Sequence, residues 1–179
     1  MPVLLLGQFV EKKISYQLND ATFESTVVYA AGEDEAMPGI LMVPNWMGPT
    51  EASLKKAKKI AGDDYVVMMI DMYGTSVRPK NSQEAGEAAG VVRGDREMMR
   101  ARMAKAHEVF LAHAADIPLK TDQLAAIGFC FGGGTILEYA RSGADVDVFV
   151  SFHGDLVSPN LESDSGSITG KVLVLHGAE

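Results

Sequence analysis

Residues 123–134, Gln-Leu-Ala-Ala-Ile-Gly-Phe-Cys-Phe-Gly-Gly-Gly, decide the fold of this 179-residue chain. A short apolar run ends at Gly128, and the helix-forming residues 135–140 follow the three glycines. The spacing Gly-x-Cys-x-Gly between a strand and a helix is the pattern of a nucleophile elbow, with cysteine in place of serine. Glycine two residues before and two residues after the nucleophile lets the turn tighten, because glycine has no Cβ. The pattern predicts that Cys130 is a nucleophile held clear of the backbone.

Strand-like and helix-like segments alternate on both sides of this elbow. The residues predict a hairpin over 12–30, then buried strands at 40–43, 65–70, 124–127, 146–152 and 172–175, with helices at 51–62, 95–115 and from the elbow to about 142. Residues 75–93 and 158–170 are expected to be irregular. The chain has no repeat and no linker, so residues 1–179 should form a single α/β domain. We expect a mostly parallel sheet with helices on both faces, a three-layer sandwich.

Polar residues and glycines gather where the predicted strands end. Packing explains the apolar strands, but it does not explain polar groups at one edge of the sheet. In open parallel sheets, ligands bind at the carboxyl ends of the strands. The sequence therefore predicts a site at this edge, built from Asn45 and Trp46, residues 71–74, Cys130, His153 and His176.

Composition excludes several classes of function. The formal net charge is -8, with 24 acidic and 16 basic residues, so we expect no nucleic-acid partner. The basic cluster at residues 55–59 is interpreted as the exposed face of a helix. One cysteine excludes an internal disulfide and a cysteine-rich zinc site.

No stretch approaches the roughly 18 apolar residues of a membrane span. We expect a cytoplasmic protein without a membrane partner, metal or cofactor, either a monomer or a weak homo-oligomer.

Taken in order, five motifs resemble the dienelactone hydrolase family of the α/β-hydrolase fold. The similarity runs from about residue 13 to the last residue. It rests on segments 44–48, 71–74, 128–133, 151–154 and 173–178. The resemblance implies hydrolysis of a small carboxylic ester or lactone through a Cys-His-Asp triad, with Cys130 as the nucleophile that forms an acyl-enzyme. The helix after the elbow points its N-terminus at the thiol, which favours the thiolate.

The resemblance also implies roles for residues around the nucleophile. The oxyanion hole would consist of the backbone N–H groups of Trp46 and Phe131. Arg78 loosely matches a family arginine that holds a substrate carboxylate; an ordinary exposed loop arginine is the alternative. Candidate substrate-binding residues are Asn45, Tyr73, Arg78 and His153.

The sequence departs from the family in two respects. Asn45 stands where the family has a glutamate beside the resting thiol, and an amide cannot take up a proton. The triad aspartate and histidine have no matching positions, so the chain resembles the first three-quarters of the fold without its last strand and helix. Glu179 is nearly in register with the acid.

The four histidines do not supply the missing base in an obvious way. His107 and His113 lie on the predicted helix 95–115, where we expect them on its wet or boundary side. His153 and His176 follow strands near the expected site, but they match family positions that are not the base.

Two other classes of function remain as alternatives. A non-catalytic fragment or pseudoenzyme would keep the fold and its pocket as a binding module. A nucleotide-binding protein of the flavodoxin or Rossmann type is disfavoured, because residues 45–49 lack the Gly-x-Gly-x-x-Gly pattern.

Overall fold

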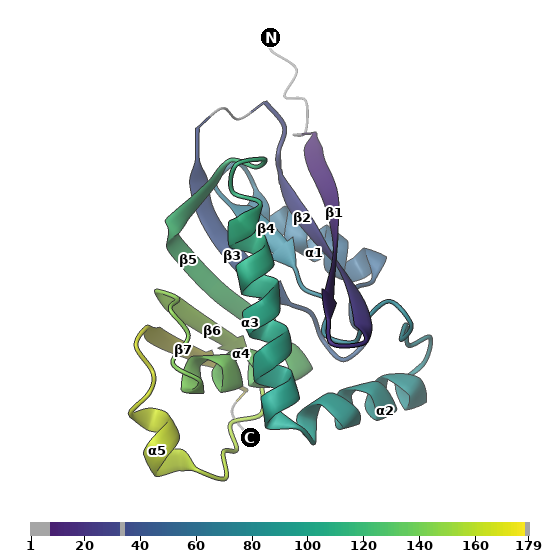
Figure 1. The fold of residues 1–179 in the computed structure, drawn as a ribbon, viewed down its shortest axis with the longest axis vertical. Helices are drawn as coiled ribbons and strands as arrows, with labels where there is room; N and C mark the ends of the chain where they lie inside the picture. Colours follow the sequence, from purple (N-terminus) through teal and green to yellow (C-terminus); the bar gives the residue numbers. More distant parts are fainter. Residues whose placement is uncertain (1–7, 33–34, 178–179) are drawn as a thin grey trace.

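A seven-stranded sheet forms the centre of the computed structural model, which describes residues 8–32 and 35–177 (Figure 1). The strand order is β1-β2-β4-β3-β5-β6-β7. The first two pairings, β1 with β2 and β2 with β4, are antiparallel, and all the others are parallel. The strands are β1 (Phe9–Leu18), β2 (Ala21–Ala30), β3 (Met37–Val43), β4 (Val66–Met69), β5 (Leu119–Phe129), β6 (Val148–Phe152) and β7 (Lys171–Leu175).

Helices cover both faces of this sheet. They are α1 (Glu51–Ala61), α2 (Ser82–Arg93), α3 (Arg96–Ala112), α4 (Phe131–Arg141) and the short α5 (Leu161–Ser165). In Figure 1, α3 lies in front of the sheet and α1 lies behind it. Two separate apolar clusters match this arrangement: one includes Ala57 and Ala61 of α1, and the other includes Phe110 of α3 and Ile136 of α4. The expected three-layer α/β architecture is confirmed. None of the helices in the described part of the chain has the length and apolarity needed to span a bilayer.

The prediction that residues 75–93 are irregular was wrong for residues 82–93, which form α2. Asn81 caps this helix, and its side-chain oxygen accepts a hydrogen bond from the Glu84 N–H at 3.0 Å. The buried residues Ala85, Ala89 and Val92 recur at helical spacing. The helix also contains Gly86 and Gly90, which are exposed. Glycine has a low helix propensity, so these two residues argued against a helix in the sequence. They do not prevent one here, because the opposite face of α2 is buried.

Smaller differences concern the ends of elements. β5 begins at Leu119, five residues before the predicted start, and pairs with β3 across a register shift between Pro38 and Gly39. The segment 158–170, expected to be irregular, contains the single-turn helix α5. The predicted hairpin and the helices after Thr50 and Asp95 are confirmed, and both of those residues cap their helices through side-chain oxygens.

β7 is an edge strand with an apolar sequence. Its four consecutive aliphatic residues, Val172 to Leu175, are 39–50% exposed. An edge strand presents unpaired backbone groups, and here both of its faces also expose apolar side chains. The other edge strand, β1, forms a ten-residue antiparallel pairing with β2.

Candidate active site

Cys130 occupies the sharp turn between β5 and α4. Its backbone has φ 56° and ψ -113°, which a residue with a side chain rarely adopts. The Cys130 N–H donates to the Phe152 carbonyl oxygen at 2.9 Å, so the neighbouring strand β6 fixes the turn. Its carbonyl oxygen accepts from the Gly134 N–H at 3.2 Å, which closes the first turn of α4. The thiol is partly exposed at the N-terminus of that helix.

The glycines around Cys130 are required by close backbone contacts. A Cβ on Gly128 would lie 2.1 Å from the Gly132 carbonyl oxygen. A Cβ on Gly132 would lie 2.2 Å from the carbonyl oxygen of Val43 on β3. Both distances are far below van der Waals contact, and both partners are backbone atoms that cannot rotate away. The structure therefore explains the Gly-x-Cys-x-Gly spacing in steric terms.

Two backbone N–H groups near the turn lack acceptors. Phe131 is the first residue of α4, and the first N–H groups of a helix have no intrahelical partner. Trp46 lies in the loop that follows β3, the strand next to β5. Among the described residues, neither the Trp46 N–H nor the Phe131 N–H donates to a protein acceptor. These are the two groups that the family resemblance implies as an oxyanion hole.

Tyr73 joins the Trp46 loop to the elbow. Its hydroxyl donates to the Trp46 carbonyl oxygen at 2.8 Å, and its ring centroid lies 5.5 Å from that of Phe131. Burial raises the pKa of the Tyr73 hydroxyl, while the charge of Arg93 opposes this and Cys130 adds to it. Tyr73 is thus a neutral donor that holds the Trp46 peptide in place.

Asn45 shapes the same loop. Its side-chain oxygen accepts from the Met47 N–H at 3.1 Å, and its carbonyl oxygen accepts from the Gly48 N–H at 2.9 Å. Gly48 has φ 73°, and a Cβ there would lie 3.1 Å from the Tyr73 ring. The Asn45 amide is therefore engaged in its own turn.

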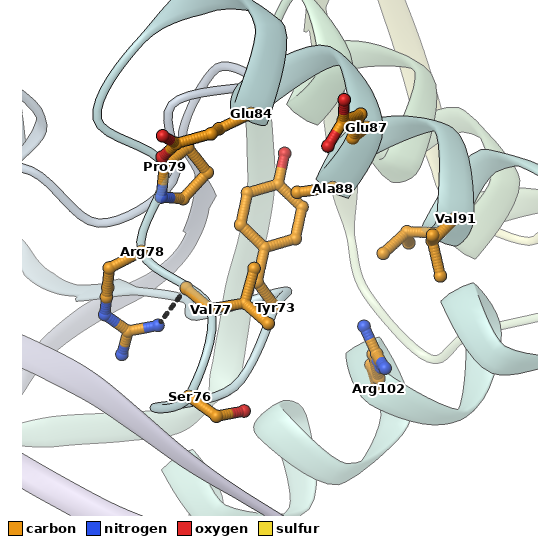
Figure 2. Close-up of a pocket in the computed structure, with 11 residues that line it drawn as sticks. Tyr73, Ser76, Val77, Arg78, Pro79, Glu84, Glu87, Ala88, Val91 and Arg102 are labelled. Atoms are coloured by element: carbon orange, nitrogen blue, oxygen red, sulfur yellow. Dashed lines mark hydrogen bonds between the residues drawn. The ribbon is translucent and has the colours of Figure 1, made fainter.

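Arg78 is engaged by Asp71 rather than free. Its guanidinium binds the Asp71 carboxylate at 2.8 and 3.3 Å and also contacts the carbonyl oxygens of Gly74 and Val77. The Asp71 side chain is fully buried and also accepts from the N–H groups of residues 24, 73 and 74. Figure 2 shows the Arg78 guanidinium beside Val77, at the rim of a pocket of 460 Å³ that Tyr73 also lines. The arrangement makes Arg78 part of the turn after β4.

His153 and His176 follow β6 and β7, at the carboxyl edge of the sheet, and both are exposed. His153 has φ 42°, and its N–H donates to the Leu175 carbonyl oxygen at 2.7 Å. Within the described residues, no hydrogen bond links either imidazole to Cys130. Glu179 lies outside the described residues.

The expectation for His107 was wrong, because this histidine is buried between α3 and α4. Its Nδ1 lies 2.8 Å from the Tyr139 hydroxyl. Burial lowers the His107 pKa, and the charge of Asp145 opposes this. His113 is partly exposed at the end of α3, with Nδ1 2.8 Å from the Val109 carbonyl oxygen. Both imidazoles therefore have structural contacts: His107 packs between two helices, and His113 binds a backbone carbonyl oxygen at the end of α3.

Sequence reasoning missed Arg93, the last residue of α2. Its guanidinium carbon lies 5.6 Å from the centroid of the Phe131 ring. Arg93 and Phe131 line a pocket of 300 Å³ that runs along the first turns of α4. Arg93 lies in the segment that was predicted to be irregular, and without a predicted helix there nothing in the sequence indicated that it lies beside the elbow.

In the described part of the chain, no three His, Cys, Asp or Glu side chains gather in an arrangement that could hold a metal ion.

Comparisons with known proteins agree with this geometry. The sequence profile of the Dienelactone hydrolase family matches residues 26–179. The solved structure named m3DLH has 32% identity and a TM-score of 0.81, covering 97% of this chain and 70% of its own. A dienelactone hydrolase-like promiscuous phosphotriesterase from metagenomic libraries has 29% identity and a TM-score of 0.86, with the same coverage.

A more distant structure shares the fold alone. It is a putative dienelactone hydrolase from Klebsiella pneumoniae, with 14% identity and a TM-score of 0.70, which covers 96% of this chain and 87% of its own. No curated protein matched the sequence. The family profile, the 32% relative and the elbow geometry lead to one conclusion: this chain belongs to the dienelactone hydrolase family and is a hydrolase.

Proposed function

We propose that this protein cleaves small carboxylic esters or lactones through a covalent acyl-enzyme on Cys130. The observation that carries the proposal is the strained backbone of Cys130, at φ 56°, together with two N–H groups without protein acceptors, one on the next residue and one in the loop after the neighbouring strand β3. A strained backbone of this kind persists only where the surrounding structure enforces it, and such strain clusters at active sites. A thiol at a helix N-terminus, beside a pair of free donors, has the parts that acyl transfer requires.

In the proposed reaction the Cys130 thiolate attacks the ester carbonyl carbon. The carbonyl π electrons move to oxygen, and the N–H groups of Trp46 and Phe131 stabilise the resulting oxyanion. As the C=O bond re-forms, the C–O bond to the leaving group breaks and an alkoxide or phenolate departs; an alkoxide takes a proton from water, which offsets the proton that the thiol lost when it ionised. A thioester remains on Cys130. Water then attacks the thioester carbonyl and the C–S bond breaks; the carboxylic acid keeps the water oxygen and one of its protons, and the other proton regenerates the thiol.

The two half-reactions place different demands on the protein. Acylation needs a nucleophile and donors for the oxyanion, and in this proposal Cys130 and the two N–H groups supply them. Deacylation needs a base that activates water. Within the described residues no imidazole or carboxylate is hydrogen-bonded to Cys130. We therefore expect the described chain to acylate faster than it deacylates, so that the thioester accumulates.

Ester hydrolysis by the purified chain tests this function. With p-nitrophenyl acetate we expect a burst of nitrophenolate of about one equivalent per chain, followed by slower turnover. Cys130→Ala should abolish the burst, because no other described residue is a cysteine. Cys130→Ser keeps the side-chain shape, but a serine hydroxyl needs an adjacent base to act as a nucleophile, so the burst of this variant should also disappear.

The non-catalytic alternative makes the opposite prediction. A binding module has no need of a reactive thiol, so iodoacetamide should label Cys130 no faster than an unstructured thiol. A burst that survives in Cys130→Ala would place the chemistry elsewhere. A folded wild-type chain with no burst and no accelerated labelling would contradict the hydrolase mechanism proposed for Cys130.

A further inference from the structure

Asp71, the second residue after β4, collects hydrogen bonds on both oxygens of a fully buried carboxylate. Its Oδ1 accepts from the Tyr73 N–H and the Gly74 N–H, each at 3.0 Å. Its Oδ2 accepts from the Glu24 N–H of β2 at 3.2 Å. The Arg78 guanidinium contacts both oxygens, at 3.3 and 2.8 Å. The carboxylate therefore joins the turn after β4 to a neighbouring strand and to the loop that follows the turn.

This set of donors requires an ionised carboxylate. A turn of this kind needs one side-chain oxygen, and Oδ1 of Asp71 supplies it. Oδ2 has a different use, because it ties the turn to Glu24 and Arg78. An asparagine would direct an NH₂ group at these two partners, which are themselves donors. The second oxygen of Asp71 thus holds the turn in place on the sheet.

The residue anchored in this way, Tyr73, contacts both segments of the proposed oxyanion hole. Strands β4, β3 and β5 are neighbours in the sheet, and Tyr73, Trp46 and Cys130 follow them in that order. The Tyr73 hydroxyl donates to the Trp46 carbonyl oxygen at 2.8 Å, and its ring centroid lies 5.5 Å from that of Phe131. A shift of the Tyr73 backbone would therefore displace the Trp46 loop relative to the elbow.

We propose that Asp71 is a positioning residue for acyl transfer at Cys130, which acts through the Tyr73 hydroxyl on the loop that carries the Trp46 N–H. The inference rests on the proposed function, in which this N–H stabilises the oxyanion. Donors of this kind stabilise a transition state only when they are in place before the reaction, so a small displacement lowers the rate of the chemical step. Loss of the Asp71 carboxylate should therefore slow acylation of Cys130.

A double-variant cycle on the burst rate with p-nitrophenyl acetate tests this link. Asp71→Asn should slow the burst about three- to tenfold, at most the loss expected from removing the Tyr73 hydroxyl itself. In the Tyr73→Phe background the same change should cost less than about twofold, because the contact through which Asp71 acts is already absent. Losses that multiply in the double variant would overturn the proposal, and so would a burst rate unchanged in Asp71→Asn.

Alkylation distinguishes a positioning role from general damage to the site. Iodoacetamide forms a C–S bond to Cys130 as iodide leaves, and this reaction develops no oxyanion. Asp71→Asn should therefore leave the alkylation rate within about twofold of wild type while the burst slows. Equal losses in alkylation and in the burst would show a general structural role and overturn the inference.

Asp164 provides a matched control. It is also a buried carboxylate that binds arginine, and in the described part of the chain it makes no hydrogen bond to Tyr73 or Trp46. Asp164→Asn should leave the burst rate within about twofold of wild type. Equal slowing in Asp164→Asn and Asp71→Asn would remove the specific assignment to Asp71.

A second variant decides the question if Asp71→Asn does not fold. Arg78 is 36% exposed, and Arg78→Gln removes the guanidinium while Asp71 keeps its backbone donors. The burst should slow less than in Asp71→Asn, and this loss should again disappear in the Tyr73→Phe background; a loss that persists there would contradict the inference. Failure of the proposed function looks different, because the wild-type chain itself would then give no burst.

Discussion

The Tyr73 hydroxyl donates a hydrogen bond to the Trp46 carbonyl oxygen at 2.8 Å. This contact joins the turn after β4 to the loop after β3. That carbonyl belongs to the peptide between Trp46 and Met47, next to the peptide that carries the Trp46 N–H. The contact therefore restrains the loop that carries the proposed oxyanion donor.

Tyr73→Phe should slow the acylation of Cys130. The variant keeps the ring that packs on Phe131 and loses only the hydrogen bond, so the fold should lose about 1 kcal/mol or less. We expect the burst rate with p-nitrophenyl acetate to fall about tenfold, a fraction of the loss typical for removing a whole oxyanion donor. Tyr16→Phe is the control: it also loses one hydroxyl contact, to Ser25 at 2.9 Å in the β1–β2 hairpin. Equal burst rates in wild type and Tyr73→Phe would remove the positioning role.

Alanine at two glycines should have opposite effects on stability. In Gly132→Ala the new Cβ would lie 2.2 Å from the Val43 carbonyl oxygen, so β3 or α4 must shift. We expect a loss of about 3 kcal/mol or more in urea unfolding. Gly90 lies on the exposed side of α2 with open space at its Cβ position, so Gly90→Ala should gain about 0.5–1 kcal/mol. A Gly132→Ala variant as stable as wild type would mean that the elbow is less tightly packed than the structure has it.

Stability should depend on pH through His107. Burial lowers the pKa of this imidazole in the folded protein, so the unfolded chain binds the proton more readily. Folding stability should therefore fall as pH drops below the unfolded pKa of about 6.5, and should level off below the lowered folded pKa. Urea unfolding at pH 7.5 and 5.5 measures the difference. In His107→Gln the difference should shrink; an identical difference in both proteins would assign the effect to other groups.

Asp164 should anchor the segment between β6 and β7. Its carboxylate accepts from the Ser158 hydroxyl at 2.5 Å and from Arg96 at 2.7 Å, and these bonds lower its pKa to about 2. This contribution is present above the usual pKa and is lost as pH falls from 3.8 towards 2. Asp164→Asn should speed proteolysis within residues 155–167 at neutral pH. Glu162→Gln, an exposed change on the same helix, should not; equal cleavage of the two variants would contradict the anchoring role.

The sequence predicted most of the sheet because buried parallel strands are short apolar runs bounded by glycine, proline and polar residues. It also predicted the elbow, whose spacing is dictated by contacts such as Gly132 against Val43. These features are local in sequence, and each follows from one steric or hydrophobic requirement. The α2 helix was missed because its signal, three small or apolar residues on one face, is weak beside two glycines and a proline.

The surroundings of the nucleophile were harder to predict, because a sequence does not show which side chains will meet in the folded chain. Arg78 carried a family resemblance, yet Asp71, seven residues earlier, engages its guanidinium. Arg93 carried no signal at all and reaches the Phe131 ring only because α2 ends beside α4. His107 was expected on the wet or boundary side of its helix, although it is buried against Tyr139 of α4. The charge and polarity of a side chain do not reveal whether another helix or strand will pack over it in the folded protein.

The most direct test of the account is the intact mass of the protein after a brief reaction with p-nitrophenyl acetate. We predict one added acetyl group per wild-type chain, located by peptide mapping on the peptide that contains Cys130 and removed by hydroxylamine at neutral pH, as a thioester should be. Cys130→Ala should gain no such group. An unmodified wild-type chain, or an acetyl group on any residue other than Cys130, would contradict the claim that this cysteine is the nucleophile.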